Sequence, residues 1–136
     1  MLTKPEYGWV YLQLGNFSER ASYMTDIPND CLDAFIYALQ NNSPTVVYFD
    51  AEGWDFHLVA SWYGSYVILD KDAVKVFEIN KNVFELAKEL YEDINNNFDD
   101  WLNWGYAFDE EEIKEYKGKL ITKLNQLNTE IEKRKG

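Results

Sequence analysis

The chain has 136 residues, a formal net charge of −11 at pH 7, and 5 Trp, 10 Tyr and 8 Phe. Disordered acidic tails are poor in aromatic residues, so this composition excludes a solvated tail and predicts a folded chain with a buried core. One domain over residues 1–136 is expected, and no stretch reaches the roughly 18 consecutive apolar residues of a membrane span. The first residues lack the apolar core of a signal peptide, and Cys31 has no second cysteine to pair with. We therefore expect a cytoplasmic protein that does not bind membranes.

Strand patterns dominate the sequence up to Ile79, with one helix among them. The first strand is aromatic and β-branched and ends at Gly15-Asn16, which predicts a turn. The helix is expected from Asp26 to about residue 40, because apolar residues recur at helical spacing after a proline in the first turn. Gly53 marks a tight turn between consecutive strands, and strands joined in this way are antiparallel. The predicted strands are residues 7–14, 20–25, 45–49, 54–62, 65–69 and 73–79.

Two long helices are expected after the strands. Asn82 and Glu85 have the spacing of a capping box that opens the first helix, which is expected to fray or bend at residues 95–97. Asp109 and Glu112 repeat this spacing at the start of the second helix, whose apolar residues form a narrow seam. Strands followed by helices indicate an α+β fold. The expected architecture is a single antiparallel sheet of about 5–6 strands with one inserted helix, and two long C-terminal helices packed on it.

The sequence contains no combination of residues that indicates catalysis. His57 is the only histidine, and nothing places Ser61 or Cys31 beside it, as a catalytic triad or dyad would require. The acidic turns lack the register of a calcium-binding loop, and one His with one Cys excludes a zinc-type ligand set. The glycines are scattered and form no phosphate-binding loop. We therefore expect no catalytic residue, no metal and no cofactor.

The charge pattern favours a basic protein as partner over nucleic acid. Binding to a phosphate backbone requires clusters of Lys and Arg. The basic residues gather in residues 117–136, where six Lys or Arg stand against two Asp or Glu. At the end of a helix, Lys133-Arg134-Lys135 simply complement the helix dipole. The acid excess lies in the rest of the chain, where it suits a partner with a positively charged surface.

Two regions combine carboxylates with large aromatic side chains. Trp54 lies in a predicted turn between carboxylates, and residues 99–106 repeat the combination at a predicted helix end. Trp and Tyr are common binding anchors, and carboxylates around them can pair with Lys or Arg. Asp and Glu at a helix start also have a structural explanation, because they stabilise the helix itself. Each aromatic ring has one too, since it can pack in the core, and Trp62 and Trp101 are the first expected there. The partner-binding candidates are Asp50, Glu52, Trp54, Asp55, Asp99, Asp100, Trp104, Tyr106, Asp109, Glu110 and Glu111.

Residues 46–54 and 23–28 give the chain a resemblance to the small acidic immunity proteins of bacterial polymorphic toxin and contact-dependent growth inhibition systems. The resemblance is one of type: a small, acidic, aromatic-rich α+β chain without catalytic machinery. It implies tight binding to a cognate toxin domain, above all a nuclease, whose basic active-site surface the chain would cover. The alternative is a phage or mobile-element inhibitor, or a regulatory adaptor, that acts as an acidic mimic of nucleic acid. The remaining alternatives are an enzyme and a structural or oligomer-forming protein.

Overall fold

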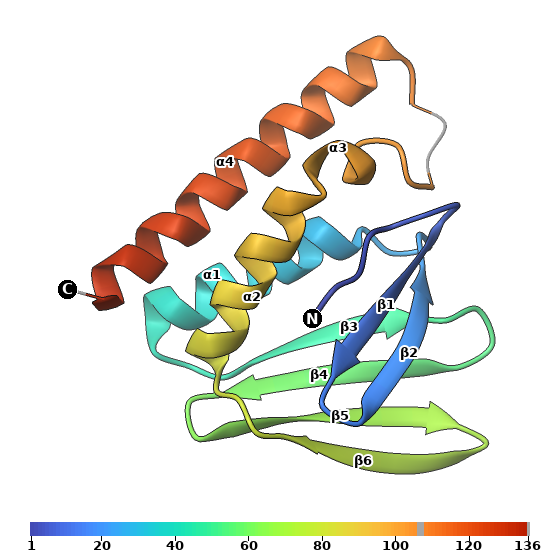
Figure 1. Ribbon diagram of the computed structural model, residues 1–136, viewed down its shortest axis with the longest axis vertical. Helices are drawn as coiled ribbons and strands as arrows, with labels where there is room; N and C mark the ends of the chain where they lie inside the picture. The colour runs from blue at the N-terminus through green and yellow to red at the C-terminus, as the bar shows by residue number, and fades with distance from the viewer. Residues whose placement is uncertain (106–107, 136) are drawn as a thin grey trace.

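The computed structural model describes residues 1–105 and 108–135 of the chain. Figure 1 shows the strands gathered below a layer of helices, which confirms the predicted α+β class. In chain order the elements are β1 (Trp9–Leu14), β2 (Phe17–Ser22), α1 (Ile27–Asn41), β3 (Thr45–Asp50), β4 (Asp55–Ser61), β5 (Gly64–Lys71), β6 (Ala73–Ile79), α2 (Val83–Asn96), α3 (Phe98–Trp101) and α4 (Glu110–Lys135).

The strands form two sheets, so the prediction of a single sheet is wrong. β1 and β2 make a two-stranded antiparallel hairpin, whereas β3, β4, β5 and β6 make a four-stranded antiparallel sheet in chain order. Because α1 separates β2 from β3 in the chain, the hairpin is free to pack on the face of the larger sheet instead of extending it. Phe17 of β2 contacts the ring edges of Phe56 in β4 and Phe77 in β6, each at a centroid distance of 5.2 Å.

Tight turns fix the ends of the strands. Gly15 has a left-handed φ of 56°, which lets Leu14 pair directly with Phe17. The second strand therefore begins three residues earlier than the predicted range 20–25. The predicted turn at Gly53 is confirmed, because Glu52 and Gly53 both have positive φ, 57° and 140°. Such turns match the twist of the strands that they join.

One face of the four-stranded sheet is covered and the other is not. The hairpin, α1 and α2 lie on the covered face (Figure 1), where Val47 and Phe49 of β3 and Phe56 of β4 are buried. These side chains join those of the hairpin and the helices in the hydrophobic core. Successive residues of a strand point to opposite faces. Tyr48 and Val46 therefore point away from the core, and both are exposed because the described elements leave that face uncovered.

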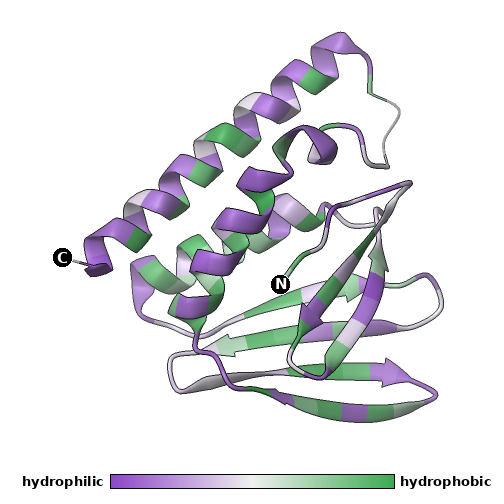
Figure 2. Ribbon diagram, viewed as in Figure 1, coloured by the Kyte–Doolittle hydropathy of each residue, from purple (hydrophilic) through white to green (hydrophobic). Residues whose placement is uncertain are grey.

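The long C-terminal helix forms an outer layer. α4 packs mainly on α1 and α2, and Figure 2 shows it as largely hydrophilic with separated hydrophobic positions, as a narrow seam requires. Both predicted capping boxes are present, Asn82 with Glu85 at α2 and Asp109 with Glu112 at α4. The first of the two predicted long helices is interrupted at Asn97, which separates α2 from the short α3.

Arg134 ties the end of α4 to α1. Its guanidinium donates to the carbonyl oxygen of Leu39 at 2.8 Å and to Oδ1 of Asn42, and it lies 4.4 Å from the centroid of the Trp62 ring. The indole Nε1 of Trp62 donates to the carbonyl oxygen of Ser43 at 3.1 Å. Trp62 is thus half-buried at the edge of the core, whereas the second ring predicted for the core, Trp101, is fully buried.

Candidate protein-binding surface

The uncovered face of the four-stranded sheet, which we call the open face, carries three rows of side chains set by the strand register. Neighbours within a row lie about 5 Å apart, and successive rows lie about 7 Å apart. The first row is Val46, Val59, Tyr66 and Glu78, the second is Tyr48, His57, Ile68 and Val76, and the third is Asp50, Asp55, Asp70 and Val74.

The third row is acidic. Asp50, Asp55 and Asp70 lie side by side on β3, β4 and β5, and we call these three residues the acidic row. Among the described residues no ion pair includes any of the three. The open face also carries Glu78, and none of its residues is a lysine or an arginine. Its carboxylates therefore act together on any approaching charge.

Two cations near the sheet, Lys71 and Arg20, lie on its covered side. Lys71, at the end of β5, pairs with Glu19 of β2 at 3.5 Å, and its Nζ lies 4.3 Å from the centroid of the Trp54 ring. Arg20 of β2 lies over Trp9, 4.4 Å from the ring centroid. These contacts hold the positive charges of the hairpin and of β5 away from the acidic row.

Aromatic and apolar side chains occupy the middle of the open face. The rings of Tyr48 and His57 lie next to each other, with centroids 5.1 Å apart. Burial raises the pKa of Tyr48 above its ordinary value, and the charges of Asp50 and Asp55, with a hydrogen bond to Asp55, raise it further. The phenol keeps its proton at neutral pH, as an unperturbed tyrosine also does, and it can donate a hydrogen bond beside the acidic row.

The turn between β3 and β4 separates its acids from its tryptophan. Asp50 and Asp55 belong to the open face, whereas Trp54 packs on the covered side, where Lys71 and, farther away, Arg20 lie over its ring. Glu52 is exposed at the turn, and its backbone N–H donates to Oδ1 of Asp50 at 2.7 Å. The structure thus groups Asp50 and Asp55 with Asp70 but does not bring Trp54 to them.

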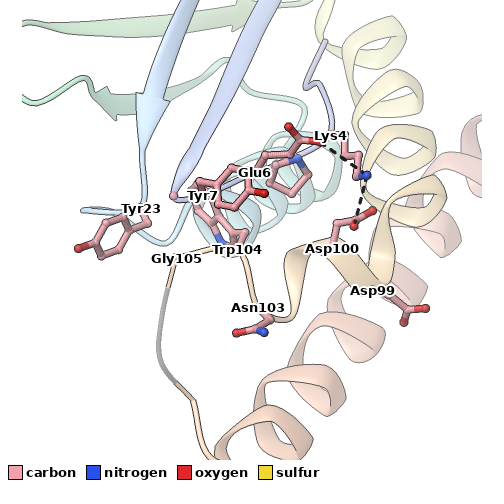
Figure 3. A pocket seen from close by; sticks show the side chains of 11 residues that line it. Lys4, Glu6, Tyr7, Tyr23, Asp99, Asp100, Asn103, Trp104 and Gly105 are labelled. Atoms are coloured by element: carbon pink, nitrogen blue, oxygen red, sulfur yellow. Dashed lines mark ion pairs between the residues drawn. The ribbon is translucent and has the colours of Figure 1, made fainter.

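The carboxylates of residues 99–106 lie beside the N-terminal residues, at a hollow of about 820 Å³ (Figure 3). Nζ of Lys4 lies 4.0 Å from Asp100 and 3.7 Å from Glu6, so these charges offset one another. Asp99 is exposed and points away from this group in Figure 3. Part of the negative charge at the hollow is therefore offset by Lys4, whereas no described ion pair offsets the charge of the acidic row.

The two tryptophans of the same segment belong to the core. Trp104 is only 3% exposed and packs edge-on against Trp101, with ring centroids 5.1 Å apart. Its carbonyl oxygen accepts a hydrogen bond from the N–H of Gly8 at 2.5 Å, which joins this segment to the start of β1. Trp104 therefore does not offer its ring to a partner. The remaining aromatic candidate of the segment, Tyr106, lies outside the described residues.

The acids at the start of α4 act on the helix itself. Oδ1 of Asp109 accepts the backbone N–H of Glu112 at 2.8 Å, which caps the helix. Glu110 and Glu111 are exposed in the first turn, where the helix dipole favours negative charge. These candidates thus have a structural role, and they lie on α4, which packs on other helices, rather than on the open face.

The residues with catalytic potential lie apart. Cys31 is fully buried in α1, and burial raises the pKa of its thiol far above the usual range. His57 faces Tyr48 on the open face, whereas the hydroxyl of Ser61 donates to the carbonyl oxygen of Gly64 at the end of β4. Within residues 1–105 and 108–135, no group of three or more His, Cys, Asp or Glu side chains is arranged to hold a metal ion.

The sequence predicted two of the carboxylates of the open face as candidates, but none of its aromatic or aliphatic residues. Asp50 and Asp55 were candidates, whereas Asp70, Tyr48 and Tyr66 were not. A signal for the missing residues exists, because β3 and β5 carry unbroken apolar runs, Val46-Val47-Tyr48-Phe49 and Tyr66-Val67-Ile68-Leu69, in place of an alternating pattern. Such runs indicate a strand that is apolar on both faces. In a sheet that is covered on one face only, the second apolar face remains exposed.

No protein-family model, curated protein or solved structure matches this chain. None of the described helices has the length and apolar character needed to cross a membrane. What the described chain offers for recognition is the open face, with its apolar middle and its acidic row.

Proposed function

We propose that this chain is a non-catalytic binding protein that neutralises a cognate bacterial toxin domain by laying its open face over the toxin's basic active-site surface. The observation that carries the proposal is the composition of the open face: aromatic and aliphatic side chains beside four carboxylates (the acidic row and Glu78) that have no ion-pair partner among the described residues, and no lysine or arginine. A nuclease is the preferred partner, because an enzyme that binds nucleic acid must present Lys and Arg to the phosphates.

The open face has the anatomy of a binding surface. Tyr48 and Tyr66 provide exposed aromatic rings, a residue type that is enriched among the energetically dominant contacts of interfaces. Val74 and Val76 are 66% and 62% exposed, so the surface also carries aliphatic area. Burial of this area against a partner would be favourable, because it would remove apolar surface from water. The acidic row borders this apolar area, as polar residues border the core of an interface.

The charge of the open face also suits rapid capture of a toxin. Complementary charge steers two proteins toward their binding orientation and can raise the association rate constant well above that of a neutral pair. A cell is protected only if the toxin is bound before it reaches its substrate. An acidic face that meets the basic substrate-binding surface of the toxin would therefore serve both speed and specificity.

Co-expression with the product of the gene next to the one that encodes this chain tests the proposal. The neighbouring product is expected to stop growth, and this chain is expected to restore it. Changing the acidic row to asparagine (Asp50→Asn, Asp55→Asn and Asp70→Asn together) should lower survival by roughly tenfold or more, because the attraction to the toxin is lost. Asparagine keeps the size of the side chains, and at position 50 it can still accept the hydrogen bond from Glu52.

A matched control removes three exposed carboxylates from the helices: Glu92→Gln, Glu115→Gln and Glu132→Gln together. This variant has the same net charge as the acidic-row variant and should protect fully. Equal protection by both variants, or a neighbouring product that this chain does not inhibit, would contradict the proposal. A non-toxic partner whose nucleic-acid site is blocked would favour the alternative, an acidic mimic of nucleic acid.

A further inference from the structure

The open face ends, on the side away from the acidic row, in a hollow of about 600 Å³ at the turn between β4 and β5. Ser61 pairs with Gly64 across this turn, and the side chain of Tyr63 is fully exposed at its tip. A Cβ atom at Gly64 would meet nothing within 4 Å, so the space above this glycine is open. Tyr66 and Glu78, which are cross-strand partners, line the hollow beside it.

We call Tyr63, Gly64, Tyr66 and Glu78 the tyrosine socket, and Glu78 supplies its charge. No ion pair between described residues includes Glu78. Lys81 lines a neighbouring hollow that Tyr63 and Gly64 also line, and it pairs with Glu89 at 2.7 Å, so its charge is already paired.

Two tyrosines and an unpaired carboxylate suit one kind of side chain. A guanidinium group is flat, stacks on aromatic faces and forms two parallel hydrogen bonds with a carboxylate. A lysine ammonium can form the ion pair, but it is a compact, strongly hydrated charge and stacks less well. An apolar side chain would leave the carboxylate of Glu78 without a partner at the contact.

We infer that the tyrosine socket binds an arginine side chain of the partner, with the guanidinium against Tyr63 and Tyr66 and paired with Glu78. This inference rests on the proposed function for the identity of the partner, and it adds a second charged contact to the acidic row. Asp70 follows Tyr66 by four positions along β5, which corresponds to about 13 Å of extended strand. The partner should therefore present an arginine about 13 Å from a basic cluster, with apolar surface between them.

The socket can be tested without the partner by titrating the ¹⁵N-labelled full chain with N-acetyl-arginine amide and recording amide shifts. Saturable shifts are expected at Gly64, Tyr66 and Glu78. N-acetyl-lysine amide should bind more weakly, and N-acetyl-norleucine amide should cause no saturable shift at these residues. Glu78→Gln and Tyr63→Leu should each weaken the binding of the arginine derivative by roughly threefold. Both side chains are exposed, so the fold is expected to survive, and the rest of each spectrum shows whether it does.

Three outcomes would overturn the socket: no saturable shift with the arginine derivative, equal shifts with the norleucine derivative, or unchanged binding in both variants. These outcomes leave the acidic row and its role in rescue untouched. Conversely, saturable arginine binding together with a failed rescue upholds the socket and overturns the toxin partner. The two proposals can therefore fail separately.

Discussion

At the scale of single residues, the acidic row places like charges next to one another. Asp55 faces Asp50 on one neighbouring strand and Asp70 on the other. Like charges directly opposite each other in antiparallel strands are destabilising, and the nearest described cation of β5, Lys71, is paired on the covered side. Sites built for function commonly lower the stability of the fold that carries them. Under the proposed function, the acidic row is such a site, and binding of a partner's Lys and Arg would relieve the repulsion between its carboxylates.

Asp70→Asn is therefore expected to raise the free energy of unfolding by about 0.2–1 kcal/mol at low ionic strength, because it relieves the repulsion from Asp55. The gain should shrink in roughly 1 M salt, where exposed charges are screened. Urea unfolding at the two salt concentrations measures both values. Glu92→Gln on α2 is the control, since it removes an exposed carboxylate that has no ion pair in the described chain. A loss of stability in Asp70→Asn, or a gain that is the same in high salt, would argue against repulsion in the row.

At the scale of the elements, local signals predicted most of the fold. Asn82 with Glu85 and Asp109 with Glu112 placed two helix starts, because a capping box is complete within four residues. The turn at Gly53 was equally visible, because it depends on a positive φ in one short segment. The separation of β1 and β2 from the larger sheet was missed, since the partner of a strand is decided by long-range packing and not by its own periodicity.

Phe17 joins the hairpin to the four-stranded sheet. It is 2% exposed and contacts both Phe56 and Phe77, which belong to the four-stranded sheet. Phe17→Ala should lower the free energy of unfolding by about 3–5 kcal/mol, because it leaves a cavity between the two sheets. Tyr11→Ala on β1 is the matched control, since Tyr11 is 45% exposed and its ring contributes less to the core. Chemical denaturation of both variants gives the comparison, and equal losses would contradict docking through Phe17.

At the scale of the whole molecule, the elements that cover the four-stranded sheet and the acidic row lie on opposite sides of that sheet. The hairpin and helices bury one face, near which Arg20 and Lys71 make their contacts, while the acidic row lies on the other. Net charge predicted a basic partner, but composition could not tell which face remains uncovered. Asp50 and Asp55 could therefore be found as candidates from the sequence, but the place of Trp54 could not: it is next to Asp55 in the chain, and the structure puts its ring on the covered side, under Lys71.

The association rate constant with the neighbouring gene product, measured as a function of ionic strength, tests the central claim most directly. If the open face binds a basic surface, association of the unchanged chain should slow by roughly tenfold or more from low to high salt. The acidic-row variant should associate more slowly at low salt and depend less on salt, whereas the helix control should behave like the unchanged chain. Identical rate constants and identical salt dependence for all three proteins would contradict the claim that the open face is the binding surface.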